Sequence, residues 1–228
     1  MGVNKNKYKE LTESLPKTVT LVAVSKTRSV EEIMELYNLG HRDFGENYVQ
    51  ELVEKHFILP HDIRWHFIGH LQSNKVKYIA PFVHLIHGVD SFKLLMEIDR
   101  QAVKLKRVVD CLLQIHIATE ETKFGLNEAE LDELVDGLKK VKETPELAHV
   151  HIAGLMGMAT FTEDKLKIAA EFQYLRTLFD KYTHTKLSNF NMQDLSMGMS
   201  ADYEEAIDHG ATMIRIGSIL FGPRLKEA

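Results

Sequence analysis

Short apolar runs alternate with amphipathic segments along the chain, and this alternation constrains the fold more than any other feature. Eight apolar runs are typical of strands, at residues 19–24, 43–44, 64–67, 85–87, 108–117, 150–156, 190–195 and 213–216. Apolar residues at helical spacing lie between them, at residues 30–39, 47–55, 73–79, 91–105, 128–141, 165–182 and 202–209. Residues 4–15 add one further helix in front of the first strand. Strands that alternate with helices in this way form a parallel sheet.

The number of strands favours a sheet that closes on itself. Eight βα units predict a (β/α)8 TIM barrel, which can use 228 residues as one domain. An open doubly wound sheet is the alternative. No linker rich in Gly, Ser or Pro divides the chain, so we expect a single domain over residues 1–228 with an extra N-terminal helix. Candidate N-caps precede or open the predicted helices, at Ser29, Ser73, Ser91 and Asn127.

Composition excludes several function classes. The formal net charge of -5 argues against a broad nucleic-acid interface, which usually needs a basic excess. No apolar stretch is long enough to span a bilayer, and residues 1–15 lack the apolar core of a signal peptide. The single cysteine, Cys111, has an apolar context and is expected to be a small buried hydrophobe. We therefore expect a protein of the reducing cytoplasm.

Lys26 ends the apolar run LVAVSK at residues 21–26. A strand this apolar is buried on both faces, and the C-terminal tips of such strands carry the chemistry of βα proteins. A lysine amine in a partly dry site can lose its proton and then form a Schiff base with an aldehyde. We therefore predict that Lys26 points into the mouth of the barrel as a reactive amine. An exposed lysine that merely ends a strand is the alternative.

Two segments near the C-terminus have small residues that suit a phosphate site. Residues 196–200 (SMGMS) follow the predicted seventh strand, and residues 215–218 (RIGS) lie at the end of the eighth. Glycine lets backbone amides approach an anion closely, helix N-termini present free N–H groups, and barrels often bind phosphate with these two loops. The alternative for each segment is a capped turn. An amine and a phosphate site on one barrel together suggest pyridoxal phosphate (PLP).

Arg215 alternates with Ile214 and Ile216 in a buried strand, so its side chain is expected to face the barrel interior or its mouth. A buried arginine needs a partner. A pyridine nitrogen can accept its hydrogen bond and, because arginine remains protonated, that nitrogen would stay unprotonated. Such a ring is a poorer electron sink than one paired with an acid, which restrains carbanion chemistry. The alternative is a salt bridge to an acidic neighbour.

Three further polar segments follow predicted strands. Asn47, after the second strand, either caps the next helix or hydrogen-bonds to the cofactor ring. His66 lies near the end of the third strand, where it can line the ligand pocket. His66 and His70 have the spacing of a helical metal pair, but the segment is a strand and no ligand set completes it, so we predict no metal. Residues 122–125 (TKFG) are expected to form a solvated loop.

Five segments together carry a recognisable pattern: VAVSK at 22–26, FGEN at 44–47, HFIGHLQSNK at 66–75, LSMGMS at 195–200 and IRIGSILFG at 214–222. In this order, and over nearly the whole chain, they resemble the pyridoxal phosphate homeostasis protein family. The resemblance implies a barrel like the N-terminal domain of alanine racemase, in the fold-type III class of PLP-binding proteins. It also implies PLP held as an internal aldimine on Lys26.

The same resemblance implies roles for other positions. Arg215 matches the partner of the pyridine nitrogen, and Asn47 and His66 match positions beside the cofactor. The positions that resemble the phosphate site are Ser196, Met199, Ser200, Gly217 and Ser218. The family commonly has threonine at position 218, and serine keeps the hydroxyl. Residues 122–125 depart from the family's more usual small residue before glycine, so the resemblance does not define the pocket wall near the fifth loop.

In function, the resemblance implies a protein that buffers or delivers PLP, with PLP-dependent apoenzymes as recipients and little or no turnover. A small PLP-dependent amino-acid racemase is the first alternative. Two-base racemisation needs groups on both faces of the substrate, and related racemases supply one from an added β domain and a partner subunit. We expect neither here, so we predict a monomer with one cofactor face open to water. A barrel enzyme that joins Lys26 to a phosphorylated metabolite is the second alternative.

Overall fold

The structure, a computed structural model, describes residues 2–120, 124–141 and 147–223. Within these residues eight parallel strands pair in chain order, and the eighth pairs with the first to close a barrel. The prediction of a (β/α)8 barrel is therefore confirmed, and the open sheet is excluded. The strands are β1 (Thr20–Val24), β2 (Asp43–Glu46), β3 (Arg64–Phe67), β4 (Leu85–Val89), β5 (Val109–Ile115), β6 (Val150–Gly157), β7 (Phe190–Met199) and β8 (Met213–Ile216).

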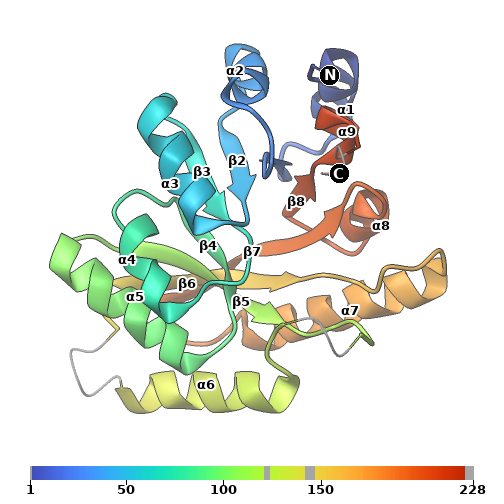
Figure 1. Ribbon diagram of the computed structural model, residues 1–228. Coiled ribbons are helices and arrows are strands. Elements are labelled where there is room, and N and C mark those ends of the chain that lie inside the picture. Colours follow the sequence, from blue (N-terminus) through green and yellow to red (C-terminus); the bar gives the residue numbers. More distant parts are fainter. Residues whose placement is uncertain (1, 121–123, 142–146, 224–228) are drawn as a thin grey trace.

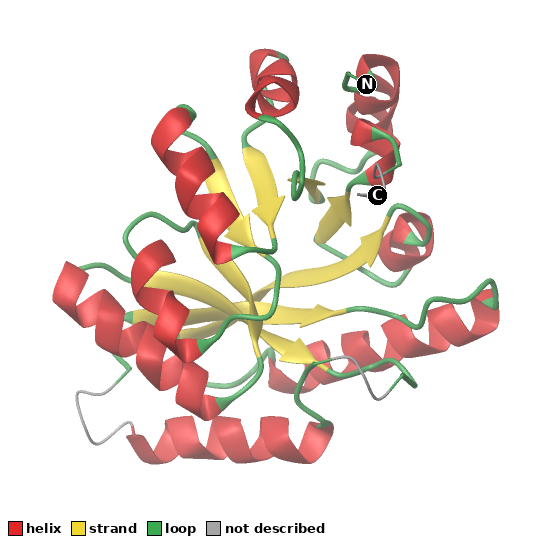
Figure 2. Cartoon of the chain, in the orientation of Figure 1, coloured by secondary structure: helices red, strands yellow, loops and turns green. Residues whose placement is uncertain are grey.

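Helices cover the outside of the barrel (Figures 1 and 2). Their apolar faces pack on the strands, which explains why the strands are apolar on both sides. One helix, α1 (Lys5–Ser14), precedes the first strand, as predicted. The others are α2 (Val30–Asn38), α3 (Val49–Ile58), the 3-10 turn η1 (Ser73–Lys75), α4 (Val76–Ile79), α5 (Phe92–Leu105), α6 (Glu128–Val141), α7 (Lys165–Tyr182), α8 (Tyr203–Asp208) and α9 (Ser218–Phe221).

The hydrophobic core has two parts because each strand is buried on both faces. The larger part packs between the strands and the helices. The smaller part fills the barrel itself and includes Val22, Leu85 and Met213. Residues level with one another in neighbouring parallel strands share a face of the sheet. Arg215 is level with Val22, and His66 is level with Leu85, so both polar side chains belong to the inner face.

The seventh strand differs from its prediction. β7 continues to Met199, so residues 196–199 are strand rather than a loop after residue 195. Gly198 allows this extension: its φ is 88°, and a Cβ there would lie 2.6 Å from the Cβ of Ala206 in α8. The pairing with β8 shifts register between Ser196 and Met199. The strand therefore bends rather than ends, and its small residues serve the close contact with α8.

Most of the predicted helix starts are confirmed. Ser29 caps α2 in a capping box with Glu32, and Ser91 accepts a hydrogen bond from the third residue of α5. The Asn127 side chain accepts from the amide of Glu130 in α6 at 3.0 Å. The prediction for Ser73 is wrong, because the segment begins as a 3-10 turn whose first residue is Ser73 itself. The short helix α9 had no counterpart among the predicted elements.

The two ends of the described chain meet on one side of the barrel, where α1 lies beside α9 (Figure 1). The Asn4 amide donates a hydrogen bond to Leu220 O at 2.8 Å, which ties the first helix to the last. Cys111 is buried, as predicted. Among the residues that the structure describes, no helix has both the length and the apolar character needed to cross a membrane.

Candidate functional site

A pocket of about 390 Å³ opens at the C-terminal ends of the strands, and we call it the upper pocket. Its volume suits a small organic ligand. The loops after β1 and β2 and the ends of β7 and β8 contribute to its wall. Most of the residues predicted from the sequence line it together, namely Lys26, Asn47, Met199, Ser200, Arg215, Gly217 and Ser218.

The residues on either side of Lys26 are held by carboxylates below the loop. Ser25 Oγ donates to Glu46 Oε1 at 2.6 Å, and the Thr27 amide donates to Glu51 Oε1 at 2.6 Å. Thr27 has a φ of 62°, a strained value for a β-branched residue. A backbone fixed on both sides limits where the Lys26 side chain can reach. The amine is therefore directed into the upper pocket by its neighbours.

Lys55 of α3 completes this support. Its ammonium donates to Glu46 Oε1, Glu51 Oε1 and Ser25 O, each at 2.7 Å. Burial raises the pKa of Glu46 to about 7, although Lys55 and Ser25 oppose that rise. Removing one partner of a buried ion pair leaves an uncompensated charge, so the three side chains act as a unit. We call Glu46, Glu51 and Lys55 the lysine-loop network.

Asn47 presents an unsatisfied acceptor to the upper pocket. Its Oδ1 is buried and has no hydrogen-bond partner among the residues that the structure describes. Of the two roles predicted for Asn47, that of helix cap is wrong, because Tyr48 occupies the N-cap position of α3. A Cβ on Gly69 would lie 2.3 Å from Asn47 O, so the loop after β3 packs tightly on the Asn47 backbone. A buried orphan acceptor in a pocket wall fits a ligand that supplies a donor.

Arg215 lies at the base of the upper pocket and is 4% exposed. One terminal nitrogen of its guanidinium, NH1, donates to Ser196 Oγ at 2.6 Å, and the other, NH2, donates to Gly157 O at 2.9 Å. Burial lowers the pKa of Arg215 to about 10, while the charge of Asp202 opposes that change. The group is therefore cationic at neutral pH. A guanidinium has five N–H donors, so these two bonds leave donors for a ligand in the pocket.

Small residues from the ends of β7 and β8 form another part of the wall. The Gly217 amide donates to Ser200 Oγ at 3.3 Å, which joins the two segments. Gly217 immediately precedes the first turn of α9, which begins at Ser218. The Met199 amide donates to Asp202 Oδ1 at 2.6 Å. Both amides are thus bonded within the protein, and the side-chain hydroxyls of Ser200 and Ser218 are the donors on this part of the wall that suit an anion.

Two predicted site residues lie elsewhere. Ser196 is fully buried below Arg215 and is not part of the pocket wall, because β7 continues through it on the inner face. His66 is on the inner face of β3, but it points toward the other end of the barrel. It lines a pocket at the N-terminal ends of the strands. Strand tilt carries the third residue of this short strand to the lower half of the barrel.

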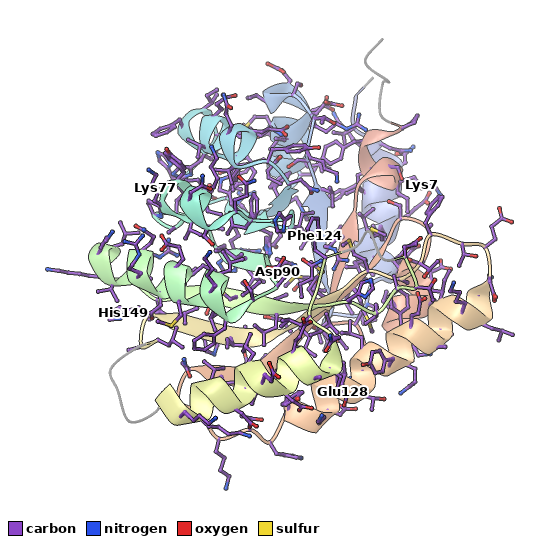
Figure 3. The ribbon with its side chains drawn as sticks, turned by 60° about the horizontal axis from the view of Figure 1, so that its bottom comes forward. Lys7, Lys77, Asp90, Phe124, Glu128 and His149 are labelled. Atoms are coloured by element: carbon purple, nitrogen blue, oxygen red, sulfur yellow. The ribbon has the colours of Figure 1, made fainter. Side chains whose placement is uncertain are left out.

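The loop after β5 is described only in part. Residues 122 and 123 of the predicted TKFG loop lie outside the described residues. The ring of Phe124 stacks on His70, with centroids 4.0 Å apart, and His70 Nδ1 lies 3.2 Å from Asp90 Oδ2. Phe124 and Asp90 accordingly lie near each other in Figure 3. The loops after β3, β4 and β5 therefore pack on one another through His70.

The sequence reasoning missed two features of the site. Arg28 lines the upper pocket, and its side chain donates to Gly222 O at 2.6 Å. It stands two residues after Lys26, so its place on the same loop was a usable signal. The lysine-loop network was missed because its contacts join α3 to β2. The spacing of Glu51 and Lys55, four residues apart on a helix, was its local sign.

The sequence matches the alanine racemase N-terminal domain family over residues 4–224. The chain is 42% identical over 205 residues to the pyridoxal phosphate homeostasis protein of Aquifex aeolicus, covering 90% of this chain and 86% of that protein. It is 36% identical over 213 residues to the protein of the same name from Escherichia coli K12, covering 92% of this chain and 87% of the relative. Relatives at this identity and coverage share a family.

Solved structures of other proteins have the same fold as this chain. PipY of Synechococcus elongatus, with PLP bound, superposes with a TM-score of 0.83 at 35% identity, covering 95% of this chain and 99% of that one. An alanine racemase from Clostridium difficile superposes with a TM-score of 0.76 at 14% identity, covering 98% of this chain and 57% of the racemase. At that identity the second likeness concerns the fold alone.

Proposed function

This chain belongs to the family of pyridoxal phosphate homeostasis proteins, and we propose that it binds PLP in the upper pocket with the Lys26 amine as the point of covalent attachment. The observation that carries the proposal is the convergence of Lys26, Arg215 and the unpartnered Asn47 oxygen on one pocket. A relative at 35% identity whose solved structure has PLP bound supports the choice of ligand.

Different residues of the pocket bind different parts of the ligand. When bound, PLP supplies an aldehyde that reacts with an amine and a ring that withdraws electrons. Lys26 would hold the ligand covalently, since an aldehyde and an amine condense with loss of one water. The lysine-loop network holds the backbone on both sides of Lys26, which keeps the amine directed into the upper pocket. Asn47 Oδ1 would accept a hydrogen bond from the ring hydroxyl, which can donate.

The anionic end of the ligand belongs with the small residues. The hydroxyls of Ser200 and Ser218 provide neutral donors on this part of the wall, and such donors can bind a phosphate. Ser196 takes an indirect part, because its oxygen orients Arg215 from below. We propose the same kind of indirect role for His66.

Arg215 determines how strongly the ring of the ligand can withdraw electrons. A donor from a guanidinium that is charged at neutral pH leaves a pyridine nitrogen unprotonated, so the ring is a weaker electron sink. We therefore propose storage or delivery of PLP to apoenzymes in the cytoplasm, by a monomer, with little or no turnover. To test turnover, the loaded protein is incubated with single L-amino acids in deuterated water. We expect no Lys26-dependent exchange of the α-proton; exchange at useful rates would favour the racemase alternative.

Loading and mapping test the attachment. Purified protein is incubated with PLP, reduced with borohydride and digested, and the pyridoxyl mass is located by peptide mapping. We expect one equivalent on the peptide that contains Lys26, and an absorbance band near the visible edge before reduction. Lys26→Arg keeps the positive charge but should lose both signals, whereas Lys75→Ala, at an exposed lysine in η1, should keep them. A label on another lysine, or failure to load, contradicts the proposal.

A further inference from the structure

A chain of hydrogen bonds runs through the inside of the barrel from Arg215 to its opposite end. Arg215 donates to Ser196 Oγ at 2.6 Å, and that oxygen lies 3.0 Å from His87 Nδ1. His87 Nε2 lies 3.0 Å from His66 Nδ1. His66 Nε2 lies 3.1 Å from Asp43 Oδ1. Five strands, β8, β7, β4, β3 and β2, each contribute one member.

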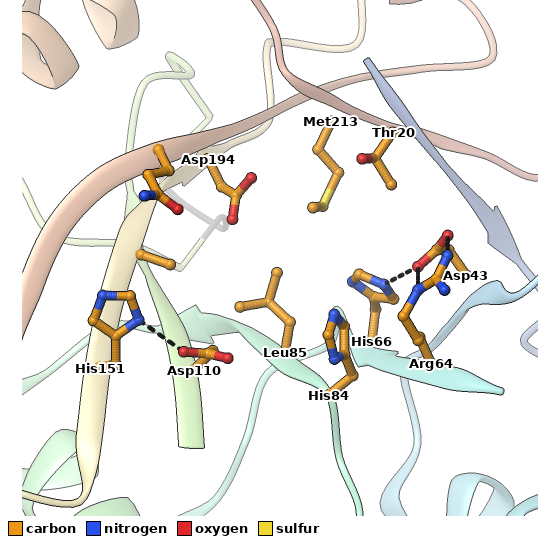
Figure 4. Close-up of a pocket in the computed structure, with 12 residues that line it drawn as sticks. Thr20, Asp43, Arg64, His66, His84, Leu85, Asp110, His151, Asp194 and Met213 are labelled. Carbon is orange, nitrogen blue, oxygen red and sulfur yellow. Dashed lines mark hydrogen bonds and ion pairs between the residues drawn. The ribbon is translucent and has the colours of Figure 1, made fainter. Parts of the chain in front are cut away.

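The far end of this chain opens to a second pocket, of about 320 Å³, which we call the lower pocket. It is lined by residues near the N-terminal ends of the strands. Figure 4 shows His66 and His84 side by side there, with Asp43 bonded to both His66 and Arg64. On the other side of the same pocket, His151 Nδ1 lies 2.7 Å from Asp110 Oδ1. The upper and lower pockets are thus joined by buried polar side chains.

The groups at the two ends of this hydrogen-bond chain, Arg215 and Asp43, determine which partner donates in each of its bonds. Burial opposes ionisation of Asp43, but hydrogen bonds from His66 and Arg64 hold its pKa well below the ordinary value, so it accepts. His66 must then donate from Nε2, and when its Nδ1 carries no hydrogen that atom accepts. His87 is neutral, because burial and the nearby positive charges hold its pKa well below the usual range.

The remaining hydrogens follow from that start. His87 donates from Nε2 to His66 and accepts at Nδ1, so the Ser196 hydroxyl donates to His87. The Ser196 oxygen is then free to accept from Arg215, which can only donate. Every polar atom along the path has a partner in this single arrangement. Cooperative polarisation along such a chain strengthens each bond in it.

We propose that His66, His87 and Ser196 are positioning residues for Arg215, and that this chain couples proton uptake at the lower pocket to ligand binding in the upper pocket. The ligand part of this inference rests on the proposed function. The chain explains why two histidines and a serine are buried in the barrel interior, where aliphatic side chains would otherwise pack.

Proton uptake changes the arrangement in a defined way. When His66 gains one proton from water, its Nδ1 becomes a donor, so His87 must accept at Nε2. His87 then carries its hydrogen on Nδ1 and donates to Ser196, whose own hydrogen must turn away. Ser196 Oγ then accepts from both His87 and Arg215, its own hydrogen has lost its acceptor, and a cation is added in the barrel. The unsatisfied hydroxyl and the repulsion between the new cation and Arg215 disturb the position of Arg215, so proton uptake and ligand binding oppose each other.

Other charged and titratable groups around the chain contribute to this balance. The His84 ring packs edge-on against His66 at 5.3 Å between centroids. Further titratable and charged groups face His66 and His87 from the neighbouring strands and loops: Arg64, His41, His84, Asp194, and, across the lower pocket, Asp110 and His151.

The decisive variant is His66→Asn. An asparagine oxygen can replace Nδ1 as the acceptor for His87, but it cannot take up a proton. We measure the Kd of PLP from about pH 8 to about pH 5, where histidines titrate. In the wild type we expect Kd to rise at low pH by at least roughly fivefold more than in the variant. His151→Asn, in the lower pocket but outside the chain, should follow the wild type.

A second measurement needs no ligand. Nitrogen-15 NMR of the histidine side chains in the apoprotein should show His87 protonated on Nε2 and bare at Nδ1. The opposite tautomer at neutral pH, or a wild-type pH profile in His66→Asn, would overturn the proposal. If PLP fails to load at all, the proposed function fails, while the His87 tautomer still tests the chain.

Discussion

Among single residues near the candidate site, Glu46 has the most unusual surroundings. Its carboxyl group is fully buried, accepts from Ser25 and Lys55, and lies directly below the Lys26 loop. Desolvation of a carboxylate is so unfavourable that these two donors only partly offset it, and the pKa is raised to about 7. The support of the reactive lysine therefore includes a group that titrates close to neutral pH.

This raised pKa predicts a pH-dependent stability. In the unfolded chain this carboxyl group has the ordinary pKa of 4.5, so between that pH and about 7 the folded state binds more protons. The stabilisation is fully present below the unfolded pKa and is lost as pH rises through the folded one. Across this window we expect the free energy of unfolding of the wild type to fall by roughly 1–3 kcal/mol relative to Glu46→Gln.

Urea denaturation at a series of pH values measures this difference. Glutamine keeps the shape and an acceptor oxygen but does not titrate in this range. Glu54→Gln, at an exposed position of the neighbouring helix α3, is the control and should reproduce the wild-type profile. If Glu46→Gln also reproduces it, the carboxylate of Glu46 is ionised throughout, and the ion pair with Lys55 dominates over burial.

Among the elements, the bend in β7 contributes most to the shape of the upper pocket. Gly198 has a positive φ and no room for a Cβ, because Ala206 of α8 lies against it. Residues that follow the bend, Met199 and Ser200, line the pocket. A change at Gly198 therefore displaces either α8 or the pocket wall.

Substitution by alanine tests this contact with a matched control. Gly40 has a φ of 95° with nothing within 4 Å of a Cβ, so Gly40→Ala reports backbone strain alone, about 1 kcal/mol. Gly198→Ala adds overpacking, and we expect a total loss of roughly 2–4 kcal/mol in the free energy of unfolding, with weaker PLP binding. Equal losses in the two variants would mean that α8 moves aside freely.

Strand β7 also shows how far the sequence could predict the structure. The strand-and-helix alternation was strong enough to predict the closed barrel, because each apolar run needs two buried faces. The end of β7 was misplaced because glycine and serine are the usual residues of loops, and a bent strand uses the same ones. Only the register with β8 distinguishes the two cases.

The end of the barrel that a side chain faces was the other property that the sequence predicted only in part. Lys26 and Arg215 were placed correctly at the upper pocket, because both stand at the C-terminal ends of strands. His66 also lies near a strand end, yet it faces the lower pocket. Strand tilt and stagger decide how high a residue lies, and neither is written in the local sequence. The contact between Lys55 and Glu46 was hidden for the same reason, since it joins separate elements.

At the scale of the whole molecule, the upper pocket is formed by segments far apart in the chain. Loops that follow β1 and β2 meet the ends of β7 and β8 there, so the first and last quarters of the chain share one wall. Residues near the two ends also meet through Asn4 and Leu220. A ligand that contacts both groups of segments binds only the closed barrel, and by mass action it stabilises the folded state.

Thermal unfolding with and without PLP measures this linkage. At a free concentration about 100 times Kd, a ligand specific for the folded state stabilises it by about 2.7 kcal/mol. For a domain of this size, that corresponds to a rise in Tm of roughly 5–10 °C. Lys26→Ala should show a smaller rise at the same PLP concentration, because its Kd is weaker. Gly40→Ala, which lowers stability away from the pocket, should show the full rise. An equal rise in Lys26→Ala and the wild type would place PLP outside the upper pocket, since binding there would then be independent of the amine.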